Sequence, residues 1–306
     1  MADTLPSWRD TPTRAALLEF VEAVGEEGSA EFVAPADRVA VFDNDGTLWA
    51  EKPVYFQFYF VLDRIRSLAG AHPEWQQEQP FKAAIAGDLK GVAATGMDGL
   101  LKLVQASHGG STMEAFEAQA GEWLAQARHP ETGRLFTDMV YQPMLELLDF
   151  LRANGFTIYI VSGGGIDFLR QFSERVYGIP RERVVGSSVA LQYRSDGGQP
   201  RIERLAKLDF IDDKEGKPVG IQRHIGRRPI LAFGNSDGDY QMLEWTTSGS
   251  GRRLGALLHH TDSKREWAYD HDSAVGRLDR GLNEAAERGW LLVDMKRDWA
   301  RVFPAP

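Results

Sequence analysis

Short apolar runs without polar alternation are the feature that most constrains the fold of this chain. The run Val39–Phe42 has no polar position, which is typical of a strand buried on both faces of a sheet. Further candidate strands, most of them separated by helical patterns, occur at Arg183–Val185, Thr157–Val161, Pro229–Phe233, Leu254–His259 and Trp290–Val293. Strands that alternate with helices form a parallel sheet covered on both faces. We therefore predict an α/β fold with a Rossmann-like core of three layers around a parallel central sheet.

The first two predicted strands are far apart in the chain. A strand–crossover–strand unit takes about 30 residues, and the stretch from Phe42 to Thr157 is much longer. Helical patterns fill it at Tyr55–Leu68, Phe81–Ile85, Asp98–Gln105, Met113–Ala127 and Met144–Arg152, and another lies at residues 12–24. We expect a core domain of residues 1–50 and 150–306, with an all-helical cap domain of residues 51–149 inserted after the first strand.

The composition excludes several kinds of site. The 306 residues include no cysteine, which rules out disulfides, thiolate metal sites and cysteine nucleophiles and suits a reducing cytoplasm. The formal net charge of -9 is unfavourable for nucleic acid, whose phosphate backbone needs a basic face. No apolar run approaches the ~20 residues that span a bilayer, and residues 1–10 lack a signal-peptide pattern. We expect a cytoplasmic protein that binds neither nucleic acid nor membrane; its oligomeric state stays open.

Two carboxylates directly follow the first predicted strand, in the segment Asp43-Asn44-Asp45-Gly46-Thr47. Ligand sites in open α/β sheets form at the carboxyl ends of strands, and carboxylates at i and i+2 can converge on one hard cation. A hairpin turn is the alternative, because Asp-Gly between apolar runs favours hairpins. A calcium loop is excluded, since with Gly46 as its sixth position the first position would be a valine.

A glycine-rich segment, Ser162–Gly165, follows the predicted strand at residues 157–161. The backbone N–H groups of Gly163 and Gly164 can approach an anion at a helix start, and the Ser162 hydroxyl can donate to a phosphate oxygen. The alternative is a turn in which the serine caps the helix that is expected from Ile166.

Oxygen-bearing side chains also follow the predicted strand at residues 229–233. Asn235, Asp237 and Asp239 lie within six residues that begin with Gly234. A turn rich in Asn, Asp and Gly is the alternative here as well.

The order of these loops resembles the signatures of the haloacid dehalogenase superfamily, in its phosphatase branch. The segment Val39–Thr47 fits the signature of an apolar strand followed by Asp-x-Asp-x-Thr, and Ser162 fits the second signature. The resemblance implies that Asp43 is the nucleophile, and that Asp45 first protonates the leaving group and then activates water. The resemblance spans Val39–Leu243, and the order of parts is most similar to phosphoserine phosphatase-like members with a helical cap of the C1 type.

The same resemblance implies a Mg²⁺ site and a lysine. The metal site consists of Asp43, the backbone carbonyl of Asp45, Asn235 and Asp239, the last accepting from bound water and from the lysine. Asn235 stands where the family usually has aspartate, so it brings an oxygen but no charge, and Asp237 is the alternative ligand.

For the lysine, the surroundings favour Lys217, which opens an amphipathic pattern after a loop. Lys214 is the alternative, and Lys207 fits less well.

The resemblance further implies that Thr47, Gly163 and Gly164 contact the substrate. A glutamate near the position of Glu51 meets the substrate amine in phosphoserine phosphatases, so Glu51 is a candidate for substrate binding; the alternative is an exposed hinge residue. The expected activity is hydrolysis of a small phosphorylated metabolite through an aspartyl-phosphate intermediate. The alternatives are a 2-haloacid dehalogenase, against which Asp45 argues, and a module that binds a phosphorylated ligand without catalysis.

The C-terminal part has one further cluster, His259–Asp262. Histidine and aspartate side chains are metal ligands, but no third and fourth ligands follow at helical spacing. We therefore interpret the cluster as the polar end of a strand.

Overall fold

The computed structural model describes residues 4–305 of the chain. Two compact units are present. The core unit comprises the residues up to Pro53, Ala127–Ser187 and the residues from Ile211 onward, and the insert unit comprises Val54–Gln126 and Ser188–Phe210. The predicted candidate site residues all belong to the core unit.

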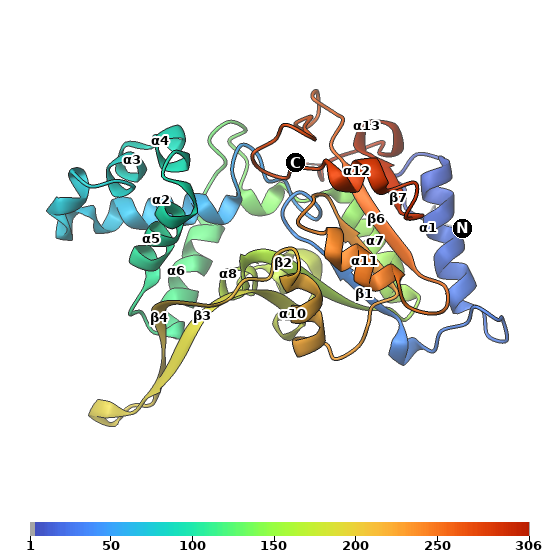
Figure 1. Ribbon diagram of the computed structural model, residues 1–306, viewed down its shortest axis with the longest axis horizontal. Helices are drawn as coiled ribbons and strands as arrows, with labels where there is room; N and C mark the ends of the chain where they lie inside the picture. Colours follow the sequence, from blue (N-terminus) through green and yellow to red (C-terminus); the bar gives the residue numbers. More distant parts are fainter. Residues whose placement is uncertain (1–3, 306) are drawn as a thin grey trace. The chain divides into compact units, whose positions relative to one another are not determined.

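The strands form one seven-stranded sheet in the order β4-β3-β2-β1-β5-β6-β7 (Figure 1). They are β1 (Val39–Phe42), β2 (Thr157–Gly165), β3 (Val184–Arg194), β4 (Arg201–Phe210), β5 (Leu231–Gly234), β6 (Leu254–His259) and β7 (Leu291–Asp294). All neighbouring pairs are parallel except β3 and β4, which are antiparallel. The predicted α/β fold with a parallel central sheet is therefore confirmed, and β4 is a strand that we did not predict.

The register of the central strands brings the predicted loops to one edge of the sheet. Phe42, the last residue of β1, lies opposite Ile160 of β2 and Phe233 of β5. Parallel strands end at the same edge, so the loops that follow β1, β2 and β5 emerge next to one another. All four residues of β1 are buried, as their apolar character predicted.

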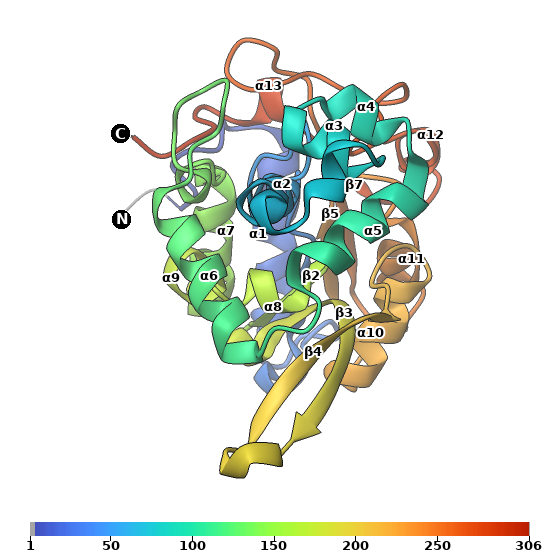
Figure 2. The ribbon, with the colours of Figure 1, turned by 90° about the vertical axis from the view of Figure 1, so that its left-hand side faces the viewer.

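Helices of the core unit cover both faces of this sheet. They are α1 (Pro12–Gly25), α7 (Gln142–Ala153), α8 (Ile166–Leu169), α9 (Ser173–Tyr177), α10 (Gly216–His224), α11 (Tyr240–Thr247), α12 (Arg280–Glu284) and α13 (Met295–Asp298), with 3₁₀ turns at Pro35–Asp37, Phe136–Asp138 and Arg181–Arg183. Ile221 of α10 and Leu243 of α11 pack against Val41 and Val161 of the sheet. Helix α7 contacts β2 on the opposite side of the sheet from α10 and α11 (Figure 2).

The insert unit contains helices and a β-hairpin (Figure 1). Its helices are α2 (Phe56–Leu68), α3 (Phe81–Ala86), α4 (Leu89–Ala93), α5 (Gly96–His108) and α6 (Met113–Gln126), with 3₁₀ turns at Ala69–Ala71, Pro73–Gln76 and Asp196–Gly198. The apolar side chains of Val61, Leu62 and Ile65 on α2 form a buried cluster with Leu103 of α5. The predicted helices are present, and α4 is an additional one.

The expected cap differs from the insert unit in two ways. The insert unit is not all-helical, because residues 188–210 of the β3–β4 hairpin group with its helices. Residues 127–149 group with the sheet instead, since α7 contacts β2. Polar residues interrupt the apolar ones along the hairpin, so its sequence has no long apolar run of the kind that predicted the central strands. None of the helices within residues 4–305 combines the length and apolar character that crossing a bilayer requires.

Candidate active site

Asp43 lies at the end of β1 with its carboxylate buried against a lysine. Its backbone N–H donates to the carbonyl of Phe233 at 2.9 Å, which extends the pairing of β1 with β5 by one residue. Its Oδ1 accepts a hydrogen bond from Lys217 Nζ at 2.7 Å. This backbone bond fixes where the Asp43 side chain starts, and the lysine fixes the direction in which it points.

The loop after Asp43 is a tight, buried turn. The carbonyl of Asn44 accepts from the backbone N–H groups of Leu48 at 2.8 Å and Trp49 at 3.2 Å, and Gly46 has a left-handed φ of 74°. The half-buried Asp45 accepts from the indole Nε1 of Trp49 at 2.8 Å. The alternative of an exposed hairpin is wrong, because both the turn and the Asp43 carboxylate are buried.

Lys217 is the cation at the centre of the site. Its Nζ donates to Asp43 Oδ1, to Asp239 Oδ1 at 2.5 Å and to the carbonyl of Val161 at 2.9 Å. Burial alone would lower the pKa of Lys217, but the carboxylates of Asp239 and Asp43 outweigh burial and raise the pKa above its ordinary value. Lys217 therefore stays charged, and Lys214 is exposed instead, so the structure brings Lys217 to Asp43 and not the alternative.

The two acids of the first loop carry raised pKa values. Burial raises the pKa of Asp43 well above its usual range, the charges of Asp239 and Asp45 raise it further, and Lys217 opposes them. Burial also raises the pKa of Asp45, against the hydrogen bond from Trp49. This crowding of negative groups makes the site receptive to a cation, which would favour the ionised carboxylates.

The loop after β5 is organised by the carboxylate of Asp239. Its Oδ2 accepts from the backbone N–H groups of Asn235 at 2.9 Å and Ser236 at 3.1 Å, while Oδ1 receives Lys217. A Cβ on Gly234 would come within 2.4 Å of the Asp239 side chain, so glycine is needed where this chain passes the carboxylate. Asp239 thus ties the loop to the lysine.

Asn235 is the member of this loop that faces the first loop. Its Oδ1 accepts from Thr47 Oγ1 at 3.1 Å, and the same hydroxyl lies 3.4 Å from Asp43 Oδ2. Asp237, the alternative ligand, instead accepts from the backbone N–H groups of Asp279, Arg280 and Gly281 at the start of α12. The structure therefore brings Asn235, and not Asp237, toward Asp43 and Thr47.

Ser162 lies in a longer strand than we predicted. Strand β2 runs on through Gly165, and the Ser162 hydroxyl accepts from the N–H of Gly164 at 3.1 Å. Helix α8 has Gly165 as its N-cap, so Ser162 is not a helix cap. Gly163 is exposed, and an added Cβ there would meet only Asp212 and Asp213 at ordinary contact distance. The segment therefore leaves room beside the serine.

Glu51 is buried, so the alternative of an exposed hinge residue is wrong. Only 1% of it is exposed. Its Oε1 accepts from Asn235 Nδ2 at 2.7 Å and from the hydroxyl of Tyr269 at 2.7 Å. Burial raises the pKa of Glu51 to about 7. Both of these hydrogen-bond donors belong to the core unit. Contact of Glu51 with a substrate amine stays a prediction.

Comparison with protein-family models decides the family of this chain. The model described as haloacid dehalogenase-like hydrolase matches residues 40–244. The chain belongs to this family. The match includes Asp43–Thr47, Ser162, Lys217 and Gly234–Asp239, so the resemblance to the family is confirmed.

Two solved structures share the fold of this hydrolase, and a third matches with a lower score. A conserved functionally unknown protein from Anaerococcus prevotii is 16% identical, with a TM-score of 0.60 over 99% of this chain and 98% of the other. A protein with unknown function from Bordetella pertussis is 16% identical, with a TM-score of 0.52 over 84% of this chain and 98% of the other. A phosphoserine phosphohydrolase-like protein from Francisella tularensis is 17% identical over 82% and 98% of the two chains, with a TM-score of 0.41. Comparison with curated protein sequences finds no significant match.

The hydrolase adds a buried network from beyond the range that the family model matches. His260 Nε2 donates to the carbonyl of Gly46 at 2.8 Å, and Nδ1 donates to Glu266 Oε2 at 3.0 Å. Glu266 Oε1 accepts from the hydroxyl of Tyr141 at 2.8 Å, and the ring of Tyr269 stacks on His260 at 4.3 Å between centroids. Burial alone would lower the pKa of His260, but Glu266 outweighs burial and raises it. The network therefore supports the turn behind Asp45 through the His260 imidazole.

Sequence reasoning missed this network for a physical reason. Strand β6 does end at His259 as we predicted, but the following His260 is 2% exposed and lies beside Gly46, which is 214 positions earlier in the chain. No local sequence pattern indicates a contact between two residues that are so far apart in the chain. Asp212 and Asp213 were also missed; burial raises the pKa of Asp212 to about 7, against the charge of Lys217.

The donor set at the strand ends fits a hard divalent cation. Asp43 Oδ2 and Asn235 Oδ1 approach the same Thr47 hydroxyl, so two oxygen atoms of the kind that Mg²⁺ binds lie near one point. Both carboxylate oxygens of Asp239 already accept from Lys217 and backbone N–H groups, which suits a supporting role. In residues 4–305 no three His, Cys, Asp or Glu side chains are grouped so that they could hold a metal. The donor set described here includes the asparagine oxygen of Asn235 and does not depend on such a group.

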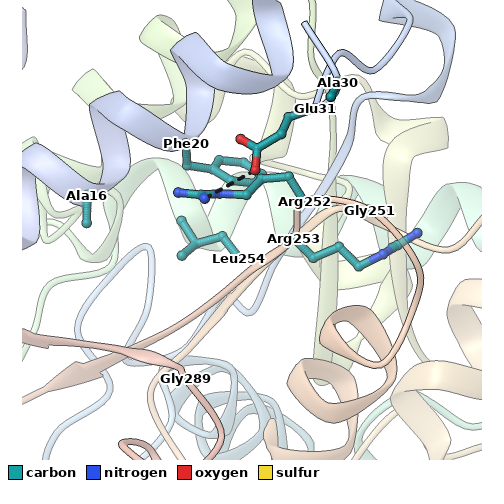
Figure 3. A pocket seen from close by; sticks show the side chains of 9 residues that line it. All are labelled: Ala16, Phe20, Ala30, Glu31, Gly251, Arg252, Arg253, Leu254 and Gly289. Carbon is teal, nitrogen blue, oxygen red and sulfur yellow. Dashed lines mark ion pairs between the residues drawn. The ribbon is translucent and has the colours of Figure 1, made fainter.

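A surface hollow of about 520 Å³ lies elsewhere on the core unit (Figure 3). It is lined by α1, the start of β6 and the segment around Glu31. Arg252 in this hollow pairs with Glu31 at 3.5 Å and with Glu19 at 3.0 Å, so its charge is compensated. Because β6 begins here and ends at His259, the hollow lies at the opposite edge of the sheet from the candidate site.

Proposed function

We propose that this member of the haloacid dehalogenase-like hydrolases is a Mg²⁺-dependent phosphomonoesterase that acts on a small phosphorylated metabolite. The observation that carries the proposal is the buried Lys217 ammonium between Asp43 and Asp239, with Asp45 two residues from Asp43. A carboxylate is nucleophilic near neutral pH without a separate base, and aspartyl-phosphate is an established type of covalent intermediate. The charge of Lys217 offsets the repulsion between an anionic nucleophile and an anionic phosphate.

In the first step, an Asp43 carboxylate oxygen attacks the phosphorus atom of the substrate. The bond between phosphorus and the leaving oxygen breaks, and Asp45 as the neutral acid gives its proton to that oxygen. The burial that raises the pKa of Asp45 favours this protonated starting form. The products of the step are the free alcohol and phosphorylated Asp43.

In the second step, the Asp45 carboxylate takes a proton from water as the water oxygen attacks the same phosphorus atom. The bond between phosphorus and Asp43 breaks, inorganic phosphate leaves, and Asp45 is protonated again. Atoms and protons therefore balance over the two steps. Ser162 and the N–H groups of Gly163 and Gly164 are the proposed donors to the phosphate oxygens, together with Thr47.

The residues that would hold Mg²⁺ are Asp43, Asp45 through its backbone carbonyl and Asn235, with Asp239 in support. A bound divalent cation supplies charge stabilisation to the phosphoryl oxygens during transfer. The location of the enzyme in the cytoplasm belongs to the same proposal.

The test is phosphate release from para-nitrophenyl phosphate with Mg²⁺, followed by excess chelator. We expect turnover that chelator abolishes, and an Asp43→Asn variant without turnover. Asp10→Asn, which makes the same change at an exposed aspartate, serves as the matched control and should keep wild-type turnover. Turnover that persists in chelator would contradict the metal, and an active Asp43→Asn would contradict the nucleophile.

Two other outcomes would replace the proposal. Halide release from 2-haloacids without metal would identify a carbon–halogen hydrolase, which the presence of Asp45 disfavours. A stable beryllofluoride complex without turnover on a broad panel of phosphate esters would identify a module that binds a phosphorylated ligand.

A further inference from the structure

Asn235 is the position at which the site lacks a charge, and a buried carboxylate lies directly behind it. Asn235 Nδ2 donates to Glu51 Oε1 at 2.7 Å. Both residues are 1% exposed. The negative charge of a buried carboxylate also acts on a group on the far side of an amide that it contacts, because no solvent lies between them to screen the charge.

The hydrogen bond also decides which way round the amide lies. Glu51 Oε1 is the acceptor in both hydrogen bonds that reach it, from Asn235 Nδ2 and from the Tyr269 hydroxyl. The NH₂ group of Asn235 must therefore face Glu51, and its Oδ1 must face the opposite direction. There it accepts from Thr47 Oγ1 at 3.1 Å, and that hydroxyl lies 3.4 Å from Asp43 Oδ2. Glu51 thus presents the oxygen of Asn235, and not its nitrogen, to the proposed cation.

The fold reserves space for the Glu51 carboxylate. A Cβ on Gly46 would come within 2.4 Å of Glu51 Oε1, and a Cβ on Gly276 would come within 1.9 Å. Both glycines also have left-handed φ values, 74° and 65°, which disfavour any other residue. The hydroxyl of Tyr269 donates to the same oxygen at 2.7 Å. Segments far apart in the chain therefore hold this carboxylate in one place.

We propose that Glu51 is a positioning residue of the cation site, which supplies the negative charge that Asn235 lacks and holds the Asn235 amide oxygen toward Asp43. The inference rests on the proposed Mg²⁺-dependent function. It assigns to Glu51 a role toward the cation, in place of contact with a substrate amine.

The first experiment measures Mg²⁺ binding directly by titration calorimetry, without substrate. In Glu51→Gln the side chain keeps its size but loses its charge and its fixed acceptor role. We expect Mg²⁺ affinity to fall by about 10- to 100-fold, the usual effect of losing a residue that orients a metal ligand. Glu287→Gln makes the same change at an exposed position and should bind Mg²⁺ like the wild type. Tyr269→Phe keeps the Glu51 carboxylate and should lose less affinity than Glu51→Gln.

The decisive experiment exchanges the charge between the two positions. Asn235→Asp alone places two carboxylates in contact, so we expect weaker folding and a thermal midpoint below that of the wild type. The double variant Asn235→Asp with Glu51→Gln restores one charge and one hydrogen bond, now donated by the glutamine. We expect it to recover Mg²⁺ affinity to within about threefold of wild type or better. If Glu51 had no role toward the cation through Asn235, Glu51→Gln would change Mg²⁺ affinity equally in the Asn235 and the Asn235→Asp backgrounds; the inference predicts a large loss in the first and little or none in the second.

The outcomes separate this inference from the proposed function. Wild-type affinity in Glu51→Gln, with the fold verified by circular dichroism, overturns the inference and leaves the metal-dependent phosphatase intact. If Glu51→Gln does not fold, Glu51→Asp decides, because it keeps the charge but withdraws it from the Asn235 amide. Reduced Mg²⁺ affinity in a folded Glu51→Asp supports the inference, and wild-type affinity overturns it. Absence of Mg²⁺ binding in the wild type overturns both.

Discussion

Two buried histidines, one in each compact unit, have pKa values that are shifted in opposite directions. His260 in the core unit directs both ring nitrogens at acceptors, the carbonyl of Gly46 and the carboxylate of Glu266. His108 in the insert unit lies between the aromatic rings of Phe60 and Phe116, at 4.6 and 4.9 Å between centroids. The pKa of His260 is raised, whereas burial and then the charges of Arg204 and Arg64 lower the pKa of His108 to about 3.

The difference between the two histidines lies in the side chains that surround each buried ring. The core unit buries charges in partnered sets, as with Lys217, Asp43 and Asp239, or His260 and Glu266. Burying a partnered charge costs free energy that an apolar core would not cost, so such sets are expected where chemistry needs them. At His108 the insert unit instead buries an imidazole that packs against rings and shares one hydrogen bond with Ser107 at 2.6 Å. Four substitutions break or sharpen this comparison.

The largest effect is expected from Lys217→Met in the core unit. It leaves Asp43 and Asp239 buried without their cation. We expect the free energy of unfolding to fall by about 3–5 kcal/mol and kcat/KM for para-nitrophenyl phosphate to fall by at least about 10³-fold. Urea unfolding and steady-state kinetics measure the two effects. Lys214→Met at an exposed position is the control, and a fully active Lys217→Met would contradict the proposed role.

His260→Leu tests the second charged set of the core unit. It removes the cation from Glu266 and the donor from the Gly46 carbonyl. We expect a loss of about 3 kcal/mol in the free energy of unfolding at pH 6, because Glu266 is left buried without a cationic partner. The folded pKa of His260 is raised, so its contribution is complete below about pH 6.5 and is lost as the pH rises through the folded pKa.

Urea unfolding of His260→Leu at several pH values measures that loss. Glu266, Glu51, Tyr269 and Tyr141 are the titratable groups around the ring. Removing both members in His260→Leu with Glu266→Leu should recover part of the stability, since no unpartnered charge then remains. A single variant as stable as the wild type at pH 6 would show that the imidazole is not held charged.

The lowered pKa of His108 predicts the opposite pH dependence of stability for the insert unit. Between about pH 6.5 and pH 3 the unfolded chain protonates this histidine and the folded chain does not, so stability falls as the pH falls. The expected loss from this group is about 2 kcal/mol at pH 5. In His108→Phe the difference in unfolding free energy between pH 7 and pH 5 should shrink by that amount.

Urea unfolding at the two pH values, with amide hydrogen exchange in α5, assigns the loss to the insert unit. His72→Phe changes a half-exposed histidine of the same unit and should leave the pH dependence unaltered. An unchanged pH dependence in His108→Phe would mean that the buried ring is not the source.

The smallest effect is expected from Tyr141→Phe, which removes a neutral donor from the same carboxylate that His260 contacts. The Tyr141 hydroxyl donates to Glu266 Oε1 at 2.8 Å. We expect a loss of about 1 kcal/mol, the usual net value of one hydrogen bond, in the free energy of urea unfolding. Tyr193→Phe on the exposed hairpin should have no measurable effect. A loss equal to that of His260→Leu would show that the charge on the imidazole adds nothing.

Much of the core unit could be predicted because its signals are local. The run Val39–Phe42 is apolar throughout, and a strand of that kind must be buried on both faces. Carboxylates placed directly after a central strand lie at the edge where the neighbouring strands also end, so Asp43 and Asn235 could be brought together from their positions alone. The β3–β4 hairpin could not be found in this way, because polar residues interrupt its apolar ones and leave no long apolar run.

The sequence by itself determined the α/β class, the order of the signature loops and the residue types available at each strand end. Only the tertiary structure decided that Lys217 and not Lys214 reaches Asp43, and that Glu51 lies against Asn235. The physical reason is that a side chain's charge, direction and burial depend on neighbours from distant segments. Glu51 and Asn235 are 184 positions apart, and no local pattern encodes a hydrogen bond over that distance.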